Sequence, residues 1–297
     1  MAEILEGGCR VTTIREGEPR LAGTMKVWRL VGRNVGAKAI SLMAMEFGCG
    51  ASPELRNREC DEVIYLLEGE GTILIEGAEY DVGPEVGVYI RPGQAFSVRN
   101  PGHKSLVLIS SRCPEPDSEP EIGLAGSGDL DVSVISGLAN TRTGGQGCVG
   151  EHSRLLGRDP ALAASRKDFT VNKVSPVVRL ADRKALPTGD RWYRVLVDDE
   201  VGCTQVTQFI GSIPPGRAPD HFHLYEEVLV ILRGRGRMWA GATNTAIEAG
   251  SCIYLPKGQI HCVENTGTDE LRLLGVFYPA GSPAVRYDAD QPPPATS

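Results

Sequence analysis

Three of the five histidines in the chain lie in one stretch, residues 216–265, at spacings that suit metal binding. His221 and His223 are separated by one residue, and Glu227 follows four residues later. Side chains two apart on a β-strand point to the same face, so one strand, or two joined by a short break, can direct all three to one point. His261 is expected to join them from a neighbouring strand. Three imidazoles and one carboxylate form a mixed ligand set that suits Fe, Mn, Ni or Zn and leaves room for water or a substrate.

The residues around these four ligands form two motifs. The first reads G-x4-H-x-H-x3-E-x6-G, and the second reads G-x5-P-x-G-x2-H-x3-N. Both resemble the two motifs of the cupin family, although the first is one residue shorter in its first gap than the commonest form. The resemblance implies an all-β fold of the jelly-roll (double-stranded β-helix) type. It also implies one divalent transition metal, held by the three histidines and the glutamate.

The same pattern of short strands and turn glycines occurs twice. EVIYLLEGEGTILIEG (62–77) aligns with EVLVILRGRGRMWAGA (227–242), which sets an offset of 165 residues between the copies. Short strands divided by glycines are typical of a sandwich or small barrel. We therefore predict two tandem cupin-like barrels. The expected parts are an N-terminal domain at 1–112, a connecting segment at 113–174, a metal-binding domain at 175–288 and a disordered tail at 289–297.

The first copy lacks the ligands. Arg56, Arg58 and Phe96 stand where the second copy has its histidines, and only Glu62 is retained. Guanidinium groups do not ligate a metal and repel one, so we predict a single metal per chain. We expect Arg56, Arg58 and Glu62 to form an ion pair that fills the vacant pocket. The alternative is an anion site built on the two arginines.

Three aromatic residues are candidates for the pocket wall: Phe209, Tyr225 and Trp239. If the GRG turn after the Glu227 strand forms a hairpin, Ile231 lies opposite Trp239. Cross-strand partners share a face, so Trp239 is expected to point inward with Glu227. Ordinary core packing is the alternative for all three aromatic side chains.

Two polar residues near the histidines are further candidates. Asn265 is four residues after His261, so parity places both on one side of a strand. It is expected to orient a ligand or to bond the backbone. Arg217 precedes the histidines in a loop, where it either binds a substrate carboxylate or is simply solvated. The run VLVIL after Glu227 is apolar throughout, so this strand is expected to be buried on both faces, one of them against the first domain or another subunit.

Composition narrows the range of partners. A chain of 297 residues is long enough for two domains, each with its own core. A net charge of −7 and a pI of about 5.4 argue against nucleic acid and an anionic membrane. The N-terminal stretch lacks the apolar core of a signal peptide, so the eight cysteines are read as reduced thiols of a cytoplasmic protein. The expected partners are a small-molecule substrate and other copies of the chain, in a homodimer or higher homo-oligomer.

Three classes of function fit the ligand set. We favour a dioxygenase, because the ligand set resembles that of several cupin dioxygenases. Glu227 would act as a base. The second class is a non-redox isomerase, lyase or aminohydrolase that uses the metal as a Lewis acid. Ureidoglycine aminohydrolases are similar in having lost one of two sites, whereas oxalate decarboxylases usually carry metal in both halves. The third class is a metal-organised small-molecule binding protein without turnover.

Overall fold

Short antiparallel strands separated by turns build the fold, as the sequence pattern predicts. The computed structural model describes residues 2–123 and 174–288, which belong to one compact unit. The predicted tail at 289–297 and most of the connecting segment lie outside these residues. The prediction of an all-β fold is confirmed, since the only helices in the described part are short 3-10 turns at Glu6–Gly8, Arg33–Val35, Leu180–Asp182 and Asp199–Val201.

Two antiparallel sheets form the first half of the chain. The larger has the order β15 (Val177–Arg179), β11 (Val86–Ile90), β8 (Asp61–Glu68), β13 (Leu106–Cys113), β5 (Leu42–Phe47), β4 (Met25–Val31) and β3 (Arg20–Ala22). The smaller has the order β10 (Ala78–Val82), β9 (Gly71–Ile75), β12 (Ala95–Asn100), β7 (Leu55–Arg56) and β14 (Glu121–Ile122), with β6 (Gly50–Ala51) paired to β12. Their inward-facing apolar side chains form one core, which includes Ile64, Leu66, Ile73 and Phe96.

The second half repeats this arrangement. Its larger sheet has the order β1 (Glu3–Ile4), β2 (Arg10–Thr13), β24 (Ser251–Leu255), β21 (Glu226–Arg233), β26 (Leu271–Tyr278), β18 (Thr207–Ile213), β17 (Arg191–Val197) and β16 (Leu186–Thr188). The smaller has the order β23 (Thr243–Glu248), β22 (Arg235–Ala240), β25 (His261–Asn265), β20 (His221–Phe222) and β27 (Tyr287–Asp288), with β19 (Gly216–Arg217) paired to β25. The matching strand order confirms the internal duplication.

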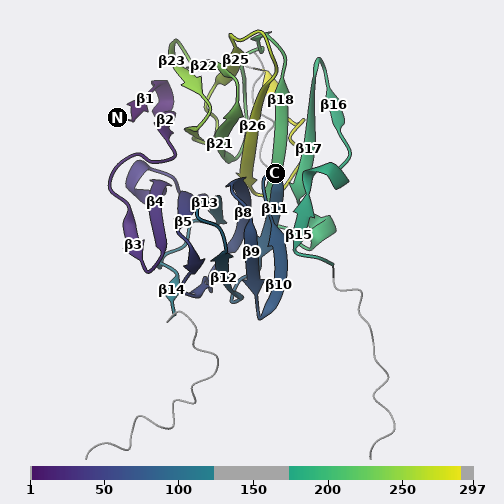
Figure 1. Cartoon of the computed structure of the whole chain (residues 1–297). Coiled ribbons are helices and arrows are strands. Elements are labelled where there is room, and N and C mark those ends of the chain that lie inside the picture. The colour runs from purple at the N-terminus through teal and green to yellow at the C-terminus, as the bar shows by residue number, and fades with distance from the viewer. Residues whose placement is uncertain (1, 124–173, 289–297) are drawn as a thin grey trace, which may run out of the picture. The chain divides into compact units, whose positions relative to one another are not determined.

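Each half contributes an edge strand to the larger sheet of the other. Strand β2 pairs with β24, and β15 pairs with β11. Figure 1 shows the purple β1 and β2 beside the green strands of the second half. The first residues of the chain, which the sequence prediction assigned to the first domain, therefore complete a sheet of the second half.

The outer faces of the two larger sheets pack against each other. Val63 and Tyr65 of β8 belong to the same buried cluster as Val228 and Val230 of β21. The alternate residues of β21 point into the second barrel, where Leu229 lies. The prediction that this strand is buried on both faces is thus confirmed, and its second face packs on the first half.

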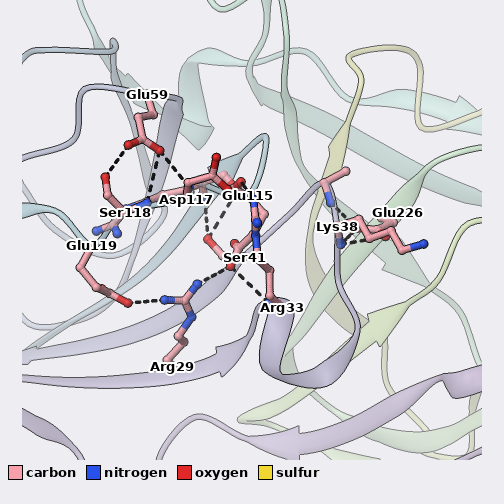
Figure 2. Close-up of polar contacts among 12 residues, drawn as sticks. Arg29, Arg33, Lys38, Ser41, Glu59, Glu115, Asp117, Ser118, Glu119 and Glu226 are labelled. Atoms are coloured by element: carbon pink, nitrogen blue, oxygen red, sulfur yellow. Dashed lines mark hydrogen bonds and ion pairs between the residues drawn. The ribbon is translucent and has the colours of Figure 1, made fainter.

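A buried acid adds polar contacts between the halves. The carboxylate of Glu226 accepts hydrogen bonds from the backbone N–H groups of Lys38 (3.0 Å) and of the residue after it (2.8 Å), at the right of Figure 2. The hydroxyl of Tyr254 donates to the same carboxylate (3.1 Å). At the matching positions in the first half, Tyr89 donates to Asp61 (2.6 Å). The acid–tyrosine pair is therefore duplicated with the fold.

Ion pairs hold the chain that follows β13 against the first half (Figure 2). Arg29 of β4 pairs with both Glu115 and Glu119, and the side chain of Glu115 is fully buried. The exposed Glu59 accepts hydrogen bonds from the hydroxyl of Ser118 and from the backbone N–H of Asp117. Hydrogen bonds and ion pairs of carboxylates thus fix residues 115–119 to the barrel.

Candidate metal centre

Three imidazole rings converge in the second barrel. His221 of β20 lies directly across from His261 of β25, and His223 follows β20 in the chain. One nitrogen from each ring lies within 4.8 Å of the others. The ring centroids of His221 and His261 are 4.5 Å apart, and those of His223 and His261 are 5.3 Å apart. The strand pairing therefore places three potential nitrogen ligands around one point.

Backbone carbonyls orient all three rings. In His221 and His261 the partner of Nδ1 is the carbonyl two residues earlier, at 3.0 and 2.8 Å. In His223 it is the carbonyl of Val285, at 3.1 Å. A carbonyl only accepts, so each Nδ1 carries the proton and each Nε2 keeps a free lone pair. Such outer hydrogen bonds are typical of metal-binding histidines, and the three residues fit a divalent metal.

Burial keeps the three rings neutral. It lowers the pKa of His223 to about 4, helped by the nearby His221. Burial also lowers the pKa of His221, and it holds that of His261 well below its usual value. Metal ligation requires neutral imidazole, so no proton has to be displaced at pH 7.

Glu227 lies beside the histidine set. Its Oε2 is 3.7 Å from Nε2 of His223, and its side chain is 6% exposed. Burial raises the pKa of Glu227 to about 8. The carboxyl group can therefore approach a metal held by the rings or carry a proton next to it, and its predicted role as fourth ligand stays a prediction.

The rings and Glu227 line a pocket of about 120 Å³. Most of its wall is apolar and consists of Tyr193, Phe209, Ile213, Leu229, Val263 and Leu273. Arg191, Trp192 and Arg286 complete one part of the lining. An apolar pocket with a few convergent polar groups is the usual form of a small-molecule site.

Two of the three predicted wall aromatics lie at this site. Phe209 of β18 lines the pocket, and its ring meets that of Phe277 edge-on at 6.0 Å. Tyr225 stacks on His223 at 4.8 Å and on Phe277 at 4.3 Å. Phe209 thus shapes the pocket, whereas Tyr225 supports a histidine ring and does not itself line the pocket.

The prediction that Trp239 points into the pocket is wrong, and Arg217, whose side chain is 40% exposed and pairs with Asp220, follows the solvated alternative. Trp239 donates from Nε1 to the carboxylate of Glu264 (2.8 Å), and the Arg217 guanidinium lies 4.1 Å from its ring centroid. The chain changes sheets after β21, so β22 pairs with β23 and β25 and does not form a hairpin with β21. The inward-facing residues of β22 are Met238 and Ala240, which are fully buried.

Asn265 bonds the backbone, which was the second of its two expected roles. Its Nδ2 donates to the carbonyls of Ile213 (2.9 Å) and Asp269 (2.8 Å). Its Oδ1 accepts from the N–H of Gly267 (2.9 Å). Asn100 makes the matching bonds in the first half, so this asparagine stabilises a turn in both barrels.

The predicted ion pair of Arg56, Arg58 and Glu62 does not form. Arg58 is 62% exposed and pairs with Glu121 at 2.6 Å. Arg56 donates to the carbonyl of Gly93 at 2.7 Å. Arg56 lies on β7, between β12 and β14, and its side chain is 31% exposed. Both long side chains thus reach toward water instead of the barrel interior.

Glu62 pairs instead with Arg112, which sequence reasoning missed. The two residues lie opposite each other on β8 and β13, with Nε of Arg112 3.1 Å from the carboxylate and both side chains almost fully buried. At the repeat offset, Arg112 corresponds to Phe277. Phe96, at the position of His261, is buried in the apolar core. The one available signal was a lone charge near the end of the apolar strand SLVLISSRC.

Arg191 and Arg286 were also missed as pocket residues. Arg191 begins β17, far from both motifs, and Arg286 immediately precedes β27. Strand β27 pairs with β20 and so carries Arg286 to the histidines. No local pattern marks either arginine, because only the sheet pairing brings them to the site.

Comparisons with known proteins agree with the duplicated fold. The cupin domain family matches residues 41–111 and 209–277. Auxin-binding protein 1 of Arabidopsis thaliana is 32% identical over 86 residues, which span 26% of this chain and 43% of that protein. An uncharacterized protein of Aquifex aeolicus (strain VF5) is 25% identical over 85 residues, which span 28% of this chain and 69% of its own.

Solved structures of similar fold include oxalate decarboxylase from Bacillus subtilis. A mutant of that enzyme has a TM-score of 0.68 at 16% identity and covers 94% of this chain and 79% of its own. Its structure at pH 4.6 has a TM-score of 0.65, also at 16% identity, with 91% and 76% covered. Within residues 2–123 and 174–288, no helix has the length and hydropathy to cross a membrane. The chain belongs to the cupin family and carries two cupin domains in tandem.

Proposed function

We propose that the second barrel holds one divalent transition metal per chain and that the protein is an enzyme acting on a small organic molecule. The observation that carries this proposal is the convergence of three neutral, backbone-oriented imidazoles in a largely apolar pocket. His221, His223 and His261 would hold the metal, with Glu227 as a fourth ligand or a neighbouring acid. The set admits Fe, Mn, Ni or Zn.

A bound metal would supply Lewis-acid activation and, where redox-active, a site for oxidative chemistry. The protein supplies the remaining parts of the reaction. The apolar wall excludes water and orients the substrate. Glu227 has the properties of a general acid or base, because its buried carboxyl group has a pKa near 8 and makes no hydrogen bond within the described structure.

We place a dioxygenase first among the possible reactions, because three histidines and one carboxylate leave positions for substrate and dioxygen. A non-redox isomerase, lyase or aminohydrolase is the second candidate. It is favoured by the position of Glu227 beside the histidine set, where it can move a proton, and by the fold similarity to a decarboxylase. A binding protein without turnover is the third.

Turnover with and without oxygen separates these candidates. The metal-loaded protein is incubated with a panel of small organic compounds under air and under nitrogen, and the products are detected by mass spectrometry. Product formation that requires air, together with oxygen consumption, supports the dioxygenase. Equal turnover under nitrogen refutes it and supports the non-redox class. Tight binding without any product supports the third class.

A further inference from the structure

The pocket beside the histidines carries an excess of positive charge. Arg191 and Arg286 both line it, and Glu227 is the one acidic residue among the lining residues. A divalent metal would add further positive charge. The pocket is therefore electrostatically suited to an anion.

Both arginines have donors to spare. Arg191 has its Nε 3.3 Å from Asp190, whose side chain is 73% exposed. Neither Nη group of Arg191 has a hydrogen-bond partner among the described residues. Arg286 has no ion pair or hydrogen bond to any described residue, and its side chain is exposed at the pocket. Both arginines line the same pocket as the three histidines. Planar guanidinium groups with free N–H donors match the two oxygens of a carboxylate.

The rest of the pocket limits the size and polarity of the ligand. Its volume of about 120 Å³ is a little below the ~150 Å³ of a cavity that accepts benzene. The lining also includes Trp192, Phe209 and Leu229, together with other apolar side chains. A compact apolar body fits this space.

We infer that the substrate is a small organic acid whose carboxylate is bound by Arg191 and Arg286 and whose compact apolar body lies against the metal-binding histidines. The inference rests on the proposed metal centre. The two arginines select for a negatively charged substrate. The histidines and the metal do not make this selection alone.

Binding of acids and their neutral amides to the manganese-loaded protein tests this assignment. The probe pairs are benzoate with benzamide and butyrate with butyramide, measured by calorimetry after the metal content has been determined. At least one acid is expected to bind ten-fold or more tightly than its amide. Arg191→Gln and Arg286→Gln should each weaken acid binding about ten-fold, the effect of losing one charge-assisted hydrogen bond, while leaving amide binding and metal content unchanged. Arg237→Gln, an exposed arginine outside the pocket, is the matched control and should change nothing.

The outcomes separate this inference from the proposed function. Protein that takes up no metal refutes the metal centre, whichever acids bind. Metal-loaded protein that binds neither acid, or binds acid and amide equally, overturns the assignment of an acid substrate and leaves the metal centre intact. An acid preference that survives both arginine substitutions overturns the role of the arginines and assigns the selectivity to the metal.

Discussion

Gly275 of β26 lies directly opposite Phe209 of β18, and the missing side chain at Gly275 leaves the space that the Phe209 ring occupies. A Cβ atom at position 275 would lie 2.3 Å from two carbons of that ring. The corresponding residue in the first half is Ser110, which bonds Glu62. The wall of the pocket in the second barrel thus depends on a glycine–phenylalanine pair that the first barrel lacks.

Gly275→Ala should force the Phe209 ring to move and should destabilise the protein by about 1–3 kcal/mol, the usual cost of overpacking a core. Denaturant unfolding measures the change. The double variant Gly275→Ala, Phe209→Leu should recover most of the loss, because the smaller side chain removes the clash. A Gly275→Ala protein as stable as the wild type would show that the Phe209 ring is not confined against position 275.

Arg112→Met should cost about 3–5 kcal/mol of unfolding free energy, because it leaves the fully buried Glu62 carboxylate without its partner. Adding Glu62→Gln should recover much of the loss. Arg58→Met is the matched control, since its ion pair with Glu121 is exposed and should contribute little to stability. Equal effects of the two arginine substitutions in urea or guanidinium unfolding would contradict the assignment of Arg112 as the internal partner.

Glu59 should make stability depend on pH. Hydrogen bonds from the Ser118 hydroxyl and the Asp117 N–H lower the pKa of its carboxyl group below the usual value. Its contribution is therefore complete above the unfolded pKa of about 4.3 and is lost as the pH falls through the lower folded pKa. Glu59→Gln should be less stable than the wild type at pH 7, and the difference should shrink toward about pH 3.

Urea midpoints measured across this pH range check the prediction for Glu59. Ser118→Ala removes the first donor and should reproduce part of the effect. A difference between wild type and Glu59→Gln that stays constant from pH 7 to pH 3 would contradict it.

The sequence predicts the parts of the site that depend on local spacing. The fold class, the duplication and the placing of His221, His223 and His261 together follow from strand parity and from the repeated motifs. The prediction for Trp239 fails because parity applies only within one strand pairing, and the chain changes sheets after β21.

The residues that were missed come to the site through pairings between distant segments. Arg112 reaches Glu62 because β13 pairs with β8, and Arg286 reaches the histidines because β27 pairs with β20. Arg191 arrives through β17, which lies between β18 and the edge strand β16 of the larger sheet. A single sequence carries no local signal for such contacts, since each depends on which strands become neighbours.

The metal content of the purified chain, measured by elemental analysis without a metal-binding tag, tests the central claim most directly. We predict one divalent transition metal per chain, lost in His223→Ala and retained in Arg58→Ala, which alters the matching position of the first half. Two metals per chain, none after loading with Fe, Mn, Ni or Zn, or full occupancy in His223→Ala would contradict the assignment of a single centre to the second barrel.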